Sequence, residues 1–128
     1  MPKVKEKIKI ALIEDDPYLS SMYATKFELE GYEVVTASDG EKGLALIQSK
    51  IPNLILLNVM MPKMNGFDVL ERIKKDDKTK DIPVILLTNL NQSDEVERGM
   101  RMGAVDYLIK AHFLPSEVVE KVKMALDT

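Results

Sequence analysis

The segment LILLNVMMPKMNG, residues 54–66, is the part of this chain that is most informative about its fold. Its first four residues are apolar without interruption, and the loop that follows the run contains a proline and a glycine. An apolar run of strand length, bounded by turn residues, predicts a strand that is covered on both faces, as in a parallel sheet. Asn58 closes this run, so the sequence predicts that its side chain lies at the mouth of a buried strand.

Similar runs alternate with segments of helical periodicity along the rest of the chain. Strands are expected at about 8–13, 32–37, 53–58, 82–88 and 105–109. Helices are expected at about 17–30, 39–50, 66–77, 92–102 and 115–127. Five strands that alternate with helices through right-handed crossovers predict an α/β fold with a doubly wound parallel sheet. The 128 residues have room for a single domain, which we place at 1–128 with its core at about 8–126.

Residues at the ends of these segments agree with the alternation. Asp16, which precedes a proline, is expected to cap the first helix, and Gly31 is expected to end it. The sequence Ser38-Asp39-Gly40-Glu41 is typical of a capping box, with Ser38 as the N-cap of the second helix. Asn65-Gly66 predicts a turn with a positive-φ glycine before the third helix.

Composition excludes several classes of function. The 18 Lys and Arg side chains against 21 Asp and Glu give a net charge of −3, so no basic field favours direct binding of nucleic acid. The chain has no cysteine, which excludes disulfides and thiolate metal sites, and its single histidine, His112, cannot build a His-rich metal site. No apolar run approaches the roughly 20 residues that a membrane span needs. We therefore expect a cytoplasmic protein that contacts neither nucleic acid nor membrane.

Polar residues stand at the ends of four predicted strands. Glu14 and Asp15 follow the first strand, Asn58 ends the third, Thr88 ends the fourth and Lys110 follows the fifth. Taken singly, the acids could cap a helix, the threonine could serve a turn and the lysine could be a surface charge. Ligands of a doubly wound sheet bind outside the carboxyl ends of the strands, so their shared position favours one functional site.

The residue types at this site indicate phosphoryl chemistry. Carboxylate and carbonyl oxygens are the ligands that Mg²⁺ prefers, so Glu14 and Asp15 predict part of a magnesium site beside Asn58. The charge of Lys110 and the hydroxyl of Thr88 would stabilise the oxygens of a transferring phosphoryl group. With an aspartate at position 58, the carboxylate would be the nucleophile that forms an acyl phosphate. An amide lacks the negative charge of a carboxylate, so the chain as written is expected not to form it.

Four segments resemble the receiver domain of two-component response regulators, and the resemblance covers roughly residues 8–126. Residues 52–66 look like the phosphoacceptor strand and loop of that family in every respect except Asn58. The others are Ile13-Glu14-Asp15-Asp16, similar to its acidic cluster, Leu86-Leu87-Thr88, similar to its hydroxyl-bearing strand, and Asp106-Tyr107-Leu108-Ile109-Lys110, similar to its switch strand. The resemblance implies a flavodoxin-like (βα)5 fold with strand order 2-1-3-4-5.

The resemblance also implies a role for each residue. Asp15 would bind Mg²⁺ directly, Glu14 would act through water, and the backbone carbonyl of Met60 and the side chain at position 58 would complete the protein ligands. Asn58 would stand at the phosphoacceptor position and weaken the binding of Mg²⁺.

Two further roles concern the switch. Thr88 and Lys110 would bind the phosphoryl group, and Tyr107 would be the switch aromatic, which turns inward after phosphorylation. The implied protein is a signalling switch rather than an enzyme. Its implied partners are a sensor histidine kinase or phosphotransfer protein and an output partner that the sequence does not identify.

Alternative functions remain open at this point. Asn58 could be an engineered or recent replacement of aspartate, or the chain could be a natural pseudo-receiver that binds its partner without phosphorylation. Retention of Asp15, Thr88 and Lys110 favours the first origin. A flavodoxin-type cofactor protein is disfavoured because acids stand where its phosphate-binding loop would lie. A Mg²⁺-dependent phosphohydrolase with an aspartyl nucleophile would place that nucleophile after its first strand.

Overall fold

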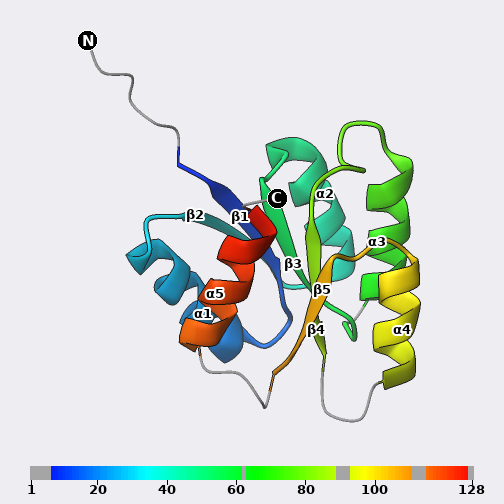
Figure 1. Cartoon of the computed structure of the whole chain (residues 1–128). Coiled ribbons are helices and arrows are strands. Elements are labelled where there is room, and N and C mark those ends of the chain that lie inside the picture. Colours follow the sequence, from blue (N-terminus) through cyan, green and yellow to red (C-terminus); the bar gives the residue numbers. More distant parts are fainter. Residues whose placement is uncertain (1–6, 62, 89–92, 111–114, 127–128) are drawn as a thin grey trace.

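The computed structural model describes residues 7–61, 63–88, 93–110 and 115–126. Five parallel strands form one sheet in the order β2-β1-β3-β4-β5 (Figure 1). The strands are β1 (Lys9–Ile13), β2 (Glu33–Ala37), β3 (Leu54–Asn58), β4 (Val84–Thr88) and β5 (Asp106–Ile109). The helices are α1 (Pro17–Leu29), α2 (Gly40–Lys50), α3 (Gly66–Lys75), α4 (Ser93–Arg101) and α5 (Pro115–Leu126). The predicted fold class, element sequence and strand order are confirmed.

Helices cover both faces of the sheet, as the uninterrupted apolar strands predict. Every residue of β3 and β4 is buried. One face is covered by α1 and α5 (Figure 1). These helices pack against alternate strand residues, and Phe27 and Val122 are both fully buried there. On the other face α2 and α3 do the same, with Ile47 and Ile73 fully buried. Among the described residues, no helix is long and apolar enough to cross a membrane.

The first helix begins and ends as predicted, whereas the N-cap of the second was placed one residue too early. Asp16 accepts hydrogen bonds from the backbone of Tyr18 and Leu19, and Gly31 follows α1 with φ of 95°. At α2, Asp39 and not Ser38 is the N-cap, and its Oδ1 accepts from the backbone N–H of Lys42 at 2.8 Å. A carboxylate at this end also interacts favourably with the helix dipole, which a serine hydroxyl does not match.

The prediction of a positive φ at Gly66 is wrong, because its φ is not positive. Asn65 caps α3 by accepting from the backbone N–H of Asp68. Gly66 is needed for space instead of for backbone freedom. A Cβ atom there would lie 2.5 Å from the backbone oxygen of Asn58 and 2.8 Å from the Cα of Val59. The start of α3 is therefore packed directly against the end of β3, where the candidate site lies.

Gly66→Ala is expected to lower the free energy of unfolding by about 2 kcal/mol, within the range for overpacking a tight contact. The clash involves backbone atoms of β3, which cannot rotate away as a side-chain tip could. Urea or thermal unfolding measures the effect. Glu71→Ala on the exposed face of the same helix is the control and should change stability by less than about 0.5 kcal/mol. Equal stability of the two variants would contradict the close approach.

Candidate functional site

The candidate site lies at the point where the sheet topology reverses direction. β1 pairs with β2 on one side and with β3 on the other, so the ends of β1 and β3 are neighbours. Glu14 and Asp15 follow β1, and Asn58 is the last residue of β3. This is the switch point at which doubly wound sheets bind ligands.

The Asn58 side chain joins the acids to the loop after β3. Its Nδ2 atom donates to Asp15 Oδ1 at 2.7 Å, to the backbone oxygen of Met60 at 3.0 Å and to Glu14 Oε2 at 3.2 Å. Only 4% of the Asn58 residue is exposed. Glu14, Asp15, Asn58 and Met60, which were predicted to share a site, are thus in direct contact.

Glu14 is the most buried charge of this group, and Lys110 is its counterion. Lys110 Nζ lies 2.6 Å from Glu14 Oε1, with 12% of the lysine side chain and none of the glutamate side chain exposed. Glu14 Oε2 also accepts from the backbone N–H of Asp16 at 3.0 Å. Burial raises the pKa of the Glu14 carboxyl above its ordinary value, although the Lys110 ammonium acts in the opposite direction. Lys110 therefore lies at the predicted site, but its partner is Glu14, for which the family resemblance implies water-mediated metal binding.

Thr88 and Tyr107 lie on the β4–β5 side of the site. The Thr88 residue is 1% exposed, and its hydroxyl is 3.5 Å from the backbone oxygen of Leu108. Leu86 of β4 is paired with Tyr107 of β5, and side chains two residues apart in a strand share a face, so Tyr107 is a diagonal neighbour of Thr88. The tyrosine ring is half-buried, with Lys121 Nζ 5.5 Å from its centroid.

The oxygen atoms at this site have the chemistry that a hard divalent cation requires. Two carboxylates and a backbone carbonyl meet within reach of one point, and these are ligands that Mg²⁺ prefers. Position 58 contributes an amide, so in the part of the chain that is described no group of three Asp, Glu, His or Cys side chains could hold a metal. The donor set fits Mg²⁺ with two acids instead of three.

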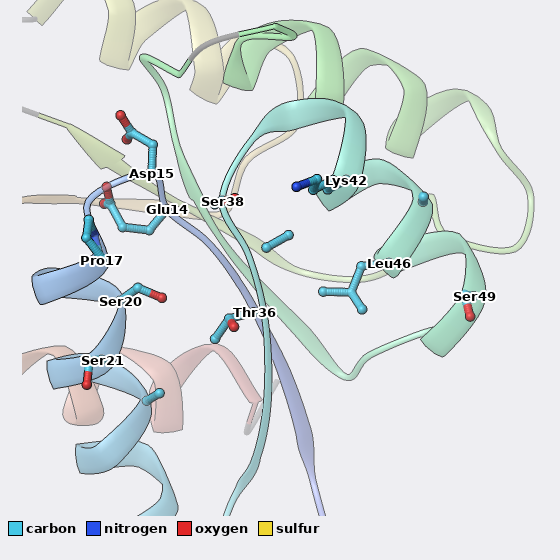
Figure 2. Close-up of a pocket in the computed structure, with 13 residues that line it drawn as sticks. Glu14, Asp15, Pro17, Ser20, Ser21, Thr36, Ser38, Lys42, Leu46 and Ser49 are labelled. Atoms are coloured by element: carbon cyan, nitrogen blue, oxygen red, sulfur yellow. The ribbon is translucent and has the colours of Figure 1, made fainter.

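An open groove of about 770 Å³ extends from the acids along the edge strand β2, between α1 and α2 (Figure 2). Ser20, Ser21 and Thr36 line it with hydroxyls, and Lys42 lies on its α2 side. This groove was not predicted from the sequence. The available signal is the spacing of Pro17, Ser20, Ser21 and Ala24, which places small residues on one face of α1.

Known proteins match this chain over most of its length. The family model for the response regulator receiver domain matches residues 10–123. A curated relative, the DNA-binding dual master transcriptional regulator RpaA of Synechocystis, is 42% identical over 118 residues, which are 92% of this chain and 48% of the relative. The chain thus spans about half the length of the curated relatives that it matches.

Solved structures share the fold over nearly the whole chain. A response regulator receiver domain protein from Methanospirillum hungatei superposes with a TM-score of 0.88 at 29% identity, covering 95% of each chain. The chemotaxis response regulator CheY4 of Vibrio cholerae gives a TM-score of 0.88 at 27% identity, covering 94% of this chain and 100% of that one.

Proposed function

Because this chain belongs to the response regulator receiver domain family, we propose that it is a phosphorylation-controlled signalling switch that Asn58 holds in its unphosphorylated form. Its proposed partner is a sensor histidine kinase or a phosphotransfer protein, together with an output partner that reads the switch. The domain itself is proposed to act as a switch and not as an enzyme.

One observation carries this proposal. The side chain at position 58 touches both acids and the loop carbonyl at the carboxyl end of β3, and Lys110 is bound to one of those acids. A carboxylate at this point would be a nucleophile surrounded by metal ligands, with a lysine nearby to stabilise the charge of a phosphoryl group. An amide at this point has no charge with which to attack phosphorus. The surroundings therefore support phosphoryl transfer, while the residue at the centre prevents it.

Each surrounding residue has a proposed part in the restored site, the one with aspartate at position 58. Glu14, Asp15 and the Met60 carbonyl would hold Mg²⁺, which when bound neutralises charge on the phosphoryl oxygens. The Lys110 ammonium would leave Glu14 and bind a phosphoryl oxygen instead. Thr88 would turn its hydroxyl from the Leu108 carbonyl toward the same group, and Tyr107 beside it would occupy the space that this movement opens.

A natural pseudo-receiver is the second candidate, and Asn58 itself favours it. The two N–H groups of the amide lie within hydrogen-bond distance of three acceptor oxygens, so the chain holds these oxygens together without any phosphoryl group. Such a module would bind its partner equally well with and without a phosphodonor. Treatment of the Asn58 chain and of Asn58→Asp with a small-molecule phosphodonor tests the proposed switch, because only the aspartate form should be modified.

The charge of this chain bears on whether it contacts nucleic acid. The name of the Synechocystis relative describes DNA binding, and this chain matches 48% of that relative's length. The net charge of −3 leads us to propose that residues 1–128 bind no nucleic acid by themselves. Retention of this chain on DNA at physiological salt would contradict that proposal.

In the restored background, Lys110→Ala and Thr88→Ala are each expected to slow phosphoryl uptake by roughly tenfold or more, because each removes a group that stabilises the developing charge. Both should also reduce the phosphorylation-dependent changes in amide NMR spectra without unfolding the domain. Lys75→Ala is the control, since its ammonium pairs with Glu71 on the exposed surface of α3. Undiminished uptake and unchanged spectral response in both site variants would show that these roles are misassigned.

A further inference from the structure

Three oxygen atoms converge on one nitrogen atom at the end of β3. Glu14 Oε2, Asp15 Oδ1 and the Met60 carbonyl oxygen lie 2.7–3.2 Å from Asn58 Nδ2. Ionised carboxylates and a backbone carbonyl can only accept hydrogen bonds, so the amide must direct its N–H groups toward these three oxygens. Its own oxygen in that place would face their lone pairs. The amide nitrogen therefore stands at the point where these oxygens would surround a cation.

One of the two carboxylates around this point has a counterion from the chain itself, and both are hydrogen-bonded to the amide. Lys110 neutralises Glu14 through Oε1, while Glu14 Oε2 accepts from both Asn58 and the backbone of Asp16. Asp15 Oδ1 forms the shortest of the three bonds to the amide. Hydrogen bonds to charged acceptors are stronger than those between neutral groups. A cation that takes these oxygens must break all of the amide contacts first.

We propose that the Asn58 amide group is a built-in competitor of the divalent cation, because its N–H groups take the oxygen ligands that the cation needs. This inference rests on the proposed function only in that it takes Glu14, Asp15 and the Met60 carbonyl as the cation ligands. It differs from the expectation that Asn58 is itself a ligand. To act as one, the amide would have to turn over and present its oxygen, losing every contact that the structure shows for its nitrogen.

The two roles predict opposite effects of removing the amide. If Asn58 is a competitor, Asn58→Ala frees the three oxygens and binds Mg²⁺ more tightly than the Asn58 chain, by roughly tenfold for about one net hydrogen bond to a charged group. The affinity for Mg²⁺ is then highest with aspartate at position 58, intermediate with alanine and lowest with asparagine. If Asn58 is a ligand, alanine loses an oxygen and binds most weakly of the three.

Titration of each form with MgCl₂, followed by backbone amide NMR, measures these affinities without any phosphoryl transfer. Asn58→Val is a second variant that removes the N–H groups while keeping a residue suited to a strand, in case alanine at this buried position disturbs folding. The expected result is tighter binding in at least one folded variant that lacks the amide. Equal or weaker binding in both, with native-like spectra, would overturn the proposal.

A second pair of variants locates the cation. In the Asp15→Ala background, Asn58→Ala should no longer increase the affinity for Mg²⁺, because the freed oxygens would then lack one carboxylate. Comparison of Asp15→Ala alone with the double variant measures this. A gain that survives Asp15→Ala would also overturn the proposal. The proposed function fails separately: if Asn58→Asp takes no phosphoryl group while Asn58→Ala binds Mg²⁺ tightly, the phosphoacceptor assignment is wrong but the competition stands.

Discussion

We expect the Asn58 chain to take up no phosphoryl group and Asn58→Asp to be modified in most of its molecules. In the presence of Mg²⁺ and phosphoramidate, a carboxylate oxygen at position 58 would attack phosphorus and ammonia would leave, which forms an acyl phosphate. The contacts of the Asn58 side chain place that oxygen beside Glu14 and Asp15, which are the proposed cation ligands. The amide of the present chain is not a comparable nucleophile, so the expected change is from no modification to modification of most molecules.

Intact-mass spectrometry of both forms measures the change, and peptide mapping assigns the modified position. Asn53→Asp is a matched control, because it makes the same chemical replacement at an exposed residue outside the site. It should remain unmodified. A phosphoryl adduct on the Asn58 chain, or none on Asn58→Asp, would refute the assignment of position 58.

The same substitution is expected to destabilise the domain when no metal is present. A carboxylate oxygen in place of Nδ2 would lie close to Asp15 Oδ1 and Glu14 Oε2, which are 2.7 and 3.2 Å from that nitrogen. Two unit charges about 3 Å apart at an effective dielectric constant near 20 repel by roughly 5 kcal/mol, as an upper bound. Relaxation of the side chains and a new partner for Lys110 reduce this figure. We expect Asn58→Asp to be less stable by about 2 kcal/mol, which corresponds to roughly 8 °C in Tm for a domain of this size.

Magnesium should narrow that difference, because a ligand that binds only the folded state stabilises it by mass action. At a free concentration of about 100 times Kd the gain is roughly 2.7 kcal/mol. Thermal melts of both forms in EDTA and in MgCl₂ measure both effects, with Asn53→Asp again as the control. Equal melting in EDTA together with equal responses to Mg²⁺ would mean that position 58 does not interact with the acids.

The sequence predicts most of this fold because its local signals agree with one another. The apolar runs of β3 and β4 are buried on both faces, and Asp16 and Gly31 mark the ends of α1 as their chemistry requires. Local signals leave an uncertainty of about one residue where two good capping residues are adjacent, as at Ser38 and Asp39. Local signals also do not distinguish a glycine that needs positive φ from one that needs space. The prediction of a positive φ at Gly66 was wrong for this reason.

The candidate site was predictable in its position but not in its contacts. Strand ends locate Glu14, Asp15, Asn58 and Lys110 at one edge of the sheet, because parallel strands end together. The pairing of Lys110 with Glu14 depends on side-chain directions across two intervening strands, and no periodicity in the sequence encodes these. The direction of the Asn58 amide likewise depends on three acceptors that come from distant parts of the chain.

The ion pair between Lys110 and Glu14 has a mechanical consequence. β5 is an edge strand with hydrogen bonds to β4 alone, so it would be expected to fray before the centre of the sheet. Lys110, however, directly follows β5, and its ammonium is fastened to Glu14 at the end of β1, beyond β3 and β4. Separation of β5 from β4 would move Lys110 away and leave the buried Glu14 carboxylate without its counterion, which costs free energy. The outermost strand on this side is thus linked to β1, and we expect it to open together with the interior strands rather than ahead of them.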